Sequence, residues 1–388
     1  MRNLARRGTP VSCVDCDDSL PGFHQRYGKT YKCPNPDTES KGWLRFMLEL
    51  AESFKDRPAL IPASDRFLMA IATHADSLSK AYRIGGDAKL QGVLSEKESL
   101  YSLAATHGMP IPRTGKVRTE ADVLEFAKAA TFPCLLKPMA AREWEIFPPG
   151  HLLHLSKVAV ANNTEELLSM YRIVGPVSPV LSIQEIIAGP DTAKLVYFSC
   201  YGREGNRIAR AMFRELRCQP EGFGCASVCE ACVDDEADAL CDGFLRRLGC
   251  RGLCEIELKR DSRDGGIKMI EANPRLSGSG DAATYAGVDL AWIHYLDLIG
   301  QDITPVAPNG RDVRHIMLRS DVLGLRSMWN RGELKWGDIS RTYKWPLAFY
   351  DMDASDLRFA ARTLYDVAHI VSGAVFRRFV PKRNRIVA

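Results

Sequence analysis

Hydrophobic and polar positions alternate along residues 252–260, with Glu255 and Glu257 between apolar neighbours. This period of two is typical of a half-buried strand. Asp-Gly-Gly at positions 264–266 favours a turn, and residues 267–273 predict the returning strand. A hairpin closed by an odd-numbered loop would place the carboxylates of Glu257 and Glu271 side by side on one face.

Two adjacent carboxylates on a half-buried sheet repel each other unless a cation neutralises them. Asn273 shares the face of Glu271 and adds a neutral oxygen. Mg²⁺ prefers such oxygen ligands and usually takes one or two carboxylates plus substrate phosphates. Arg275 follows the strand and could pair with a phosphate or an acyl phosphate. The alternative interpretation is the polar outer face of an ordinary hairpin.

Short strands and amphipathic helices alternate near the N-terminus. The pattern predicts a strand over 10–15, a helix over 43–54 and a strand over 58–62, which is the order of a doubly wound domain. The first strand and glycine-rich turn of such a domain are missing, so we expect a truncated one. We interpret Asp65 as an N-cap residue of the next helix rather than as a catalytic residue.

Later segments combine strands with isolated polar residues. The apolar strand 132–138 contains Lys137 near its end, and a buried strand over 180–187 precedes Gly-Pro-Asp at 189–191. A lysine at a strand end can act as a point charge on a phosphate. Lys97 lies in the first turn of a predicted helix, where a cation gains nothing from the helix dipole, and this favours a functional role.

Composition limits the class of protein. The 388 residues carry a net charge of +4, which argues against a dedicated nucleic-acid binder, and the length predicts two or three domains. We find neither a secretory signal nor an apolar run long enough to span a bilayer, so we expect a cytoplasmic protein.

Most of the 12 cysteines should be free thiols. Cys225, Cys229 and Cys232 have a spacing used in iron–sulfur sites. We favour a cysteine-rich strand, in which cysteine acts as a small hydrophobic residue.

The sequences EIE at 255–257 and IEANPR at 270–275 resemble the magnesium-binding core of the ATP-grasp superfamily. PCLLKP at 133–138 and QEIIAGPD at 184–191 resemble further motifs of that family, in the expected order. The resemblance implies an α+β or α/β protein with the ATP-grasp fold. It implies a truncated doubly wound pre-ATP-grasp domain over 1–92, an ATP-grasp domain over 93–300 with a lid subdomain at about 113–187, and a C-terminal extension over 301–388.

The resemblance also implies roles for individual residues. The metal ligands would be Glu257, Glu271 and Asn273, and Lys97 and Lys137 would contact phosphates. The adenine would lie at the hinge of Gln184, Glu185 and Ile187, and the ribose at Asp191, which could equally be a turn residue. We favour Arg217 over Arg214, with Arg275, as the basic residues near the transferred phosphate.

The expected glycine-rich lid is absent from the sequence after Lys137. Arg142, Lys157 or both could replace its phosphate contacts with side-chain charge. His151 and His154 lack further ligands at zinc spacing, and we interpret them as lid or surface residues.

The implied activity is that of an ATP- and Mg²⁺-dependent ligase, with Mn²⁺ as an alternative ion. Such an enzyme activates a small, amino-acid-like carboxylate as an acyl phosphate and joins it to an amine. The missing glycine-rich lid disfavours a biotin carboxylase. The alternative is a non-catalytic nucleotide-binding or membrane-peripheral protein with the same fold. The expected partners are small molecules and not nucleic acid, and the resemblance allows a homodimer.

Residues 359–379 predict a C-terminal helix whose apolar stripe contains Leu364, Val367, Ala368 and Val371, followed by a basic end. Such a helix could lie on a membrane surface. We favour a packed helix with a solvated basic end that suits the helix dipole.

Overall fold

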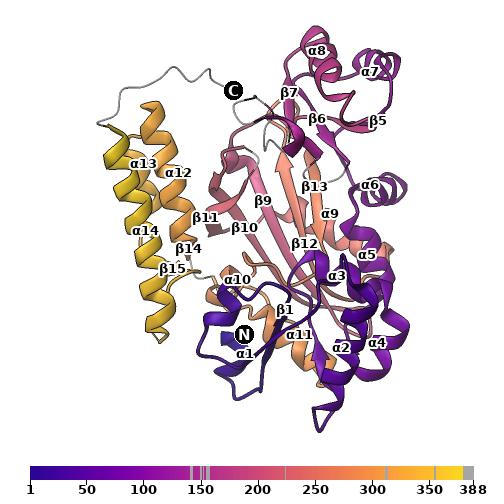
Figure 1. Cartoon of the computed structure of the whole chain (residues 1–388), viewed down its shortest axis with the longest axis vertical. Coiled ribbons are helices and arrows are strands. Elements are labelled where there is room, and N and C mark those ends of the chain that lie inside the picture. The colour runs from indigo at the N-terminus through magenta and orange to yellow at the C-terminus, as the bar shows by residue number, and fades with distance from the viewer. Residues whose placement is uncertain are drawn as a thin grey trace. The chain divides into compact units, whose positions relative to one another are not determined.

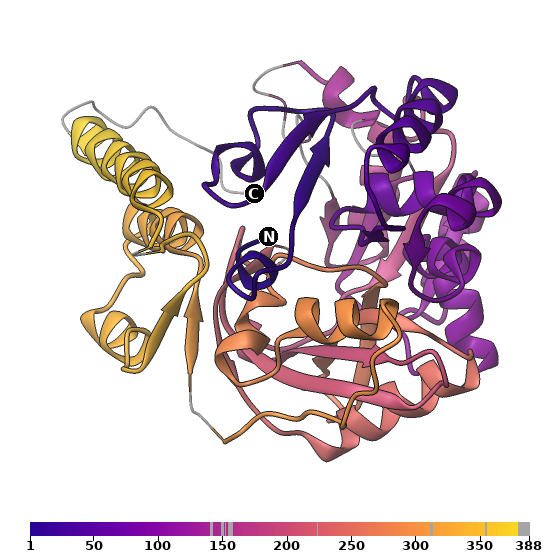
Figure 2. The same ribbon diagram turned by 90° about the horizontal axis from the view of Figure 1, so that it is seen from below.

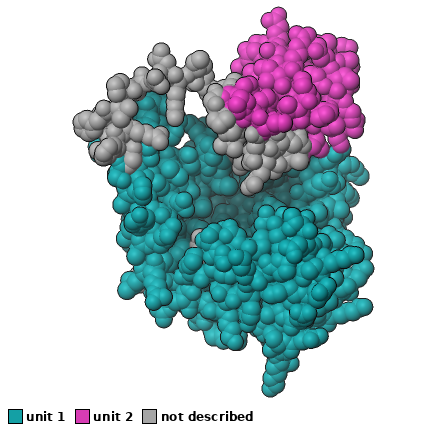
Figure 3. All heavy atoms as spheres, viewed as in Figure 1, with its two compact units in different colours: residues 1–109, 190–259, 271–381 teal, residues 110–189, 260–270, 382–388 magenta. Residues whose placement is uncertain are grey.

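The computed structural model describes residues 1–139, 143–148, 151, 153, 158–222, 224–310, 313–353 and 355–378. The chain forms two compact units, which Figure 3 shows in different colours. Unit 1 comprises residues 1–109, 190–259 and 271–381, and unit 2 comprises residues 110–189, 260–270 and 382–388.

A seven-stranded sheet in the order β13-β12-β9-β10-β11-β14-β15 organises unit 1 within the described residues (Figure 1). The pairs β12–β9, β9–β10, β10–β11 and β11–β14 are antiparallel, whereas β14–β15 is parallel. The strands are β9 (Lys194–Tyr201), β10 (Arg207–Gln219), β11 (Cys225–Ala231), β12 (Gly252–Arg260), β13 (Ile267–Asn273), β14 (Arg314–Ile316) and β15 (Leu347–Phe349).

Successive side chains of a strand point to opposite faces of the sheet, and along β9 the residues on both faces are buried. Val196 and Phe198 of β9 pack with Phe213 of β10 in the core cluster that also includes residues of α10 (Asp281–Tyr285) and α11 (Leu290–Leu298). Helix α9 (Asp235–Arg247) packs on β9. Its N-cap residue, Asp234, accepts the Ala237 N–H at 3.1 Å, which satisfies a helix-terminal donor.

The N-terminal part of unit 1 contains two parallel strand pairs, β1–β2 and β3–β4. Trp43, Met47 and Leu78 lie in the buried core of this region. The elements are α1 (Arg2–Ala5), β1 (Ser12–Asp15), η1 (Pro21–His24), β2 (Lys29–Lys32), α2 (Ser40–Glu52), β3 (Ala59–Leu60), α3 (Asp65–Thr73), α4 (Ala75–Ala81), β4 (Arg83–Ile84), α5 (Ala88–Ser95) and α6 (Lys97–Thr106).

Unit 2 contains a four-stranded antiparallel sheet in the order β5-β8-β6-β7. Its core includes Val123, Leu136 and Leu167, from two helices and a strand. A capping box between Thr119 and Asp122 begins α7. The elements are β5 (Thr114–Val117), α7 (Glu120–Ala127), β6 (Cys134–Pro138), η2 (Glu143–Ile146), β7 (Ala159–Ala161), α8 (Thr164–Val174) and β8 (Leu181–Glu185).

The C-terminal segment of unit 1 continues the large sheet through β14 and β15 and adds three helices. These are α12 (Leu318–Arg331), α13 (Trp336–Thr342) and α14 (Leu357–Arg378). Helices α12 and α14 pack on each other and lie side by side in Figures 1 and 2. Of the helices in the described ranges, none is long and apolar enough to cross a membrane.

The cysteines agree with the interpretation of a cysteine-rich strand. Cys225 and Cys229 lie in β11, and all 12 cysteines are free thiols. In the part of the chain that the structure describes, no group of three histidine, cysteine or acidic residues is arranged to hold a metal ion. The iron–sulfur alternative therefore has no support from these residues.

Candidate active site

The carboxyl groups of Glu257 in β12 and Glu271 in β13 lie close enough for each to shift the pKa of the other. Burial, and then the charges of Glu271 and two other glutamates, raise the pKa of Glu257 well above its usual range. Burial also acts to raise the pKa of Glu271, but nearby Lys97 and the hydrogen bond from Asn273 outweigh it and lower that pKa. The pair thus contains one carboxyl group that favours the proton and one that favours the charge. Six residues (261–266) separate the strands, so the loop is even-numbered and not odd, although the two side chains do meet.

Asn273 is oriented by the carboxylate of Glu255. Its Nδ2 donates to Glu255 Oε1 at 2.9 Å and to Glu271 Oε1 at 3.3 Å. Glu255 is buried and also accepts hydrogen bonds from the hydroxyl groups of Ser277 and Ser279. The amide nitrogen of Asn273 thus faces the two carboxylates. Its Oδ1, the oxygen that could bind a cation, accepts a hydrogen bond from Arg275 Nη2 at 3.1 Å.

The donor set fits a hard divalent cation. Two carboxyl groups and one amide oxygen are the ligand types that Mg²⁺ takes in proteins, with phosphates and water completing the octahedron. Burial is the largest cause of the raised pKa of Glu257, and the charges of the neighbouring glutamates raise it further against the opposing effect of Lys194.

Two cations lie next to the carboxylates. Lys97, the first residue of α6, places Nζ 3.3 Å from Glu271 Oε2. The guanidinium of Arg275 donates through Nε to Asp65 Oδ1 at 2.6 Å and through Nη2 to Asp65 Oδ2 at 3.1 Å. The N-cap interpretation of Asp65 was wrong, because Ser64 occupies the N-cap position of α3 and Asp65 is bidentate to Arg275.

Asp191 belongs to a second polar cluster in unit 1. Lys194 Nζ lies 3.6 Å from Asp191 Oδ1 and 3.4 Å from Glu215 Oε2, and the Cys218 thiol donates to Asp191 at 2.8 Å. Burial acts to lower the pKa of Lys194, but Glu215 and its other anionic neighbours raise it above its usual range. Burial raises the pKa of Glu215 to about 7.

Arg217 of β10 is buried against the C-terminal segment. Its Nε donates to Asp321 Oδ1 of α12 at 2.7 Å, and its Nη2 donates to the Thr342 hydroxyl at 2.9 Å. Asp321 has no exposed surface and also accepts from Ser227 and Tyr343. These contacts favour a structural role for Arg217, while the alternative Arg214 is exposed.

The remaining predicted nucleotide-binding residues belong to unit 2. Lys137 Nζ donates to Gln184 Oε1 at 3.0 Å, and Gln184 Nε2 donates to Thr114 at 2.9 Å. Glu185 Oε1 accepts the Thr131 N–H at 2.6 Å, and Ile187 is buried. Cross-strand pairing of β6 with β8 explains why Lys137 and Gln184 meet.

Arg142, Lys157 and His154 lie outside the described residues. His151 is described, and its ring stacks on Phe147 with the centroids 4.5 Å apart. Within the described residues this is a local packing contact.

The sequence did not identify three acidic or basic residues as part of the site: Glu255, Lys194 and Glu215. Glu255 carried a signal, since it shares the polar face of Glu257 by strand alternation. Lys194 and Glu215 meet across neighbouring strands, and no short-range pattern predicts that pairing.

No protein-family model matches the chain. A curated relative, the D-aspartate ligase of Enterococcus faecium (strain Aus0004), is 26% identical over 264 residues, which is 64% of this chain. The chain matches 61% of that relative's length, less than two thirds.

Two solved structures show the fold. The biotin carboxylase domain of Hydrogenobacter thermophilus 2-oxoglutarate carboxylase, in complex with MgADP, ADP and bicarbonate, has a TM-score of 0.59 at 14% identity, covering 78% of this chain and 67% of that one. The L-amino acid ligase of Bacillus licheniformis has a TM-score of 0.54 at 17% identity, covering 76% of this chain and 69% of that one.

The chain therefore has the ATP-grasp fold, as the sequence resemblance implied. The mixed α/β architecture that was expected from the sequence is confirmed.

Proposed function

We propose that the protein is an ATP- and Mg²⁺-dependent ligase that activates a small, amino-acid-like carboxylate as an acyl phosphate and joins it to an amine. The observation that carries the proposal is the adjacent carboxyl pair of Glu257 and Glu271, with the Asn273 amide 3.3 Å from Glu271. The names of the D-aspartate ligase and the L-amino acid ligase support an amino-acid substrate. The MgADP complex of the biotin carboxylase domain supports the nucleotide and the ion.

Glu257, Glu271 and Asn273 would hold Mg²⁺, which supplies charge neutralisation at the phosphates when bound, and Mn²⁺ could replace it. In the first step a carboxylate oxygen of the substrate attacks the γ-phosphorus of ATP, and ADP leaves with the electrons of the broken bond. In the second step the amine nitrogen attacks the acyl carbon, loses a proton, and phosphate leaves.

Each step needs cations that are already in position, because phosphoryl transfer depends mainly on positioning and charge. Arg275 meets this need, since the carboxylate of Asp65 fixes its guanidinium plane. Lys97 would offset the charge that develops on the phosphates. We further propose that Lys137 contacts phosphate, that Gln184, Glu185 and Ile187 contact the adenine, and that Asp191 contacts the ribose.

The first test is nucleotide binding, followed by the melting temperature during an ATP titration with Mg²⁺ or with EDTA. We expect a Mg²⁺-dependent rise, and phosphate release when suitable amino acids are added. Glu271→Gln should abolish that release without unfolding the protein. Metal-dependent turnover that survives this substitution would remove the metal assignment. Binding of ATP without phosphate release from any amino-acid pair would favour a nucleotide-binding regulator.

A further inference from the structure

Helix α14 buries one face and leaves a second, apolar face in solvent. On the packed face, the Thr363 hydroxyl donates to the Asp351 carbonyl, and the Ile370 carbonyl accepts from Arg326 of α12 at 3.0 Å. Figures 1 and 2 both place α14 on the outer side of α12. The opposite face of α14 is therefore the one that meets solvent.

The exposed face carries large apolar side chains at helical spacing. Leu357 is 76% exposed, Leu364 51% and Val371 49%, and Ala361 and Ala368 lie between them in steps of four and three residues. These five residues form one continuous stripe. The predicted packing stripe was wrong for Leu364, Ala368 and Val371, which are exposed, whereas Val367 is partly buried.

Positive charge flanks the stripe. Arg358 and Arg362 are exposed beside it, and residues 357–388 contain seven lysine and arginine residues but one acidic residue, Asp366. Asp366 is itself paired with Arg319 at 3.7 Å and Arg362 at 3.3 Å. A second copy of the helix would bring like charge against this face, whereas an anionic surface would complement it.

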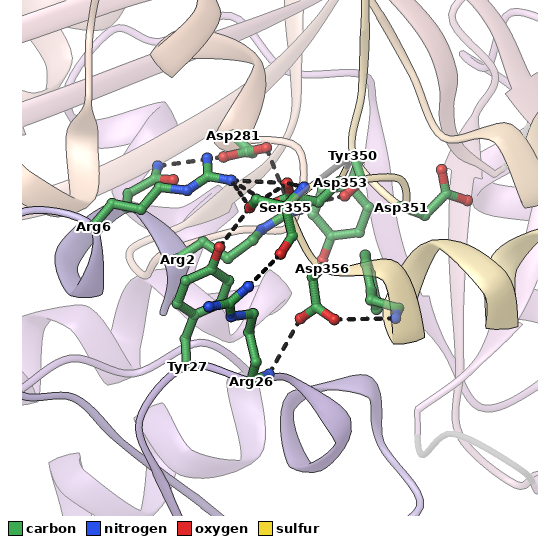
Figure 4. A network of polar contacts seen from close by, with 12 residues as sticks. Arg2, Arg6, Arg26, Tyr27, Asp281, Tyr350, Asp351, Asp353, Ser355 and Asp356 are labelled. Carbon is green, nitrogen blue, oxygen red and sulfur yellow. Dashed lines mark hydrogen bonds and ion pairs between the residues drawn. The ribbon is translucent and has the colours of Figure 1, made fainter.

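The start of α14 is anchored to the rest of unit 1 by a network of polar contacts (Figure 4). Asp353 accepts from Arg2 at 3.1 Å and from Arg6 at 2.6 Å. Asp356 accepts the backbone N–H groups of Arg26 and of Phe359 at the first turn of α14. The stripe is thus presented on a fixed base.

We propose that α14 docks the protein on a membrane surface that contains anionic lipids. The stripe of Leu357, Ala361, Leu364, Ala368 and Val371 enters the boundary between head groups and acyl chains, as the apolar face of an interfacial helix does. Arg358 and Arg362, which are exposed beside the stripe, meet the lipid phosphates. Tyr365, which is 63% exposed, has the amphipathic ring favoured at that depth. The proposal is independent of the ligase activity.

Co-sedimentation of the whole protein with lipid vesicles tests this docking. We expect binding to vesicles of phosphatidylcholine mixed with phosphatidylglycerol, weaker binding to phosphatidylcholine alone, and a loss of affinity at high salt. Leu364→Glu, and separately the double substitution Arg358→Glu and Arg362→Glu, should each weaken binding about tenfold or more. Leu124→Glu is the matched control, because Leu124 is a 45% exposed leucine on α7, and it should bind as the wild type does.

Several outcomes would overturn the proposal. Absence of vesicle binding, equal binding to neutral and anionic vesicles, or unchanged binding by Leu364→Glu would each do so. Sedimentation equilibrium provides the remaining check: a dimer that Leu364→Glu dissociates would assign the stripe to a second copy of the chain instead. Circular dichroism melts verify that each variant is folded.

Discussion

The side chains of Asn273 and Glu255 are hydrogen-bonded, with Nδ2 of the amide 2.9 Å from Oε1 of the carboxylate. The same nitrogen lies 3.3 Å from Glu271 Oε1, so the amide turns its nitrogen to both carboxylates and its Oδ1 to Arg275. Since Glu255 also accepts from Ser277 and Ser279, its own position is fixed on three sides. Glu255 is therefore a positioning residue for the site.

Glu255→Gln should weaken the affinity of the site for Mg²⁺. Glutamine has one accepting oxygen and no charge, whereas the carboxylate of Glu255 accepts three hydrogen bonds through two oxygens. The substitution therefore removes the fixed orientation of Asn273. Partners of this kind typically change metal affinity tenfold to a hundredfold. We expect the Mg²⁺ concentration for half-maximal ATP turnover to rise by about tenfold. Ser279→Ala, which removes one donor to Glu255, should have a smaller effect, and an unchanged Mg²⁺ titration in Glu255→Gln would contradict the assignment.

Asp65→Asn should lower turnover and hardly affect stability. Asparagine keeps the size of the side chain but has only one oxygen for Arg275, so the guanidinium loses its bidentate partner. We expect roughly a tenfold fall in kcat. The free energy of unfolding should change by less than about 1 kcal/mol, as for exposed ion pairs. Asp37→Asn is the control, since Asp37 pairs with Arg66 at 2.7 Å on the surface. Equal kcat values in the two variants would remove the role given to Asp65.

Asp321→Ala should destabilise the protein strongly. The substitution leaves the buried guanidinium of Arg217 without its charged partner, and breaking such a pair costs about 3–5 kcal/mol. Denaturant unfolding measures this loss. The double substitution Arg217→Met and Asp321→Leu removes both charges and should recover much of the stability. If the double variant is stable and yet inactive with ATP, Arg217 acts in catalysis after all.

Acid should destabilise the protein through two buried histidines. Burial lowers the pKa of His294 to about 4 and of His315 to about 4. In the unfolded chain a histidine has a pKa near 6.5, so between pH 6.5 and 4 the unfolded state binds more protons than the folded state. The free energy of unfolding is therefore fully retained above pH 6.5. It falls as the pH drops towards 4, by up to roughly 3 kcal/mol per histidine.

Unfolding curves at several pH values test this dependence. His294→Gln lacks the titrating ring, so its free energy of unfolding should decline with acid about half as steeply over this range. A variant with the slope of the wild type would show that His294 titrates normally in the folded protein.

The carboxylate pair could be predicted because strand alternation is a local property. The period of two in 267–273 places Glu271 and Asn273 on one face of their strand, and the period in 252–260 does the same for Glu255 and Glu257. Whether the two faces coincide depends on the register of the hairpin. The loop parity was wrong, since it depends on hydrogen bonding within 261–266 that composition alone does not determine.

Contacts between distant segments could not be predicted. Arg217 and Asp321 are 104 positions apart, and nothing near either residue indicates the other. The prediction that the Leu364 stripe of α14 packs against the protein was wrong for a different reason. Helical periodicity identifies apolar faces, but α14 has two, and only tertiary packing decides which one meets α12.

The outermost strands of the large sheet have a consequence for synthesis on the ribosome. Strand β15 ends at Phe349, and Asp353 binds Arg2, a residue 351 positions earlier. Domains usually fold as units while the chain emerges. Unit 1 cannot complete its sheet or close this contact until nearly the whole chain printed here has left the exit tunnel. Until β14 emerges, the edge of the sheet at β11 lacks its partner strand, and an unpaired strand edge favours aggregation.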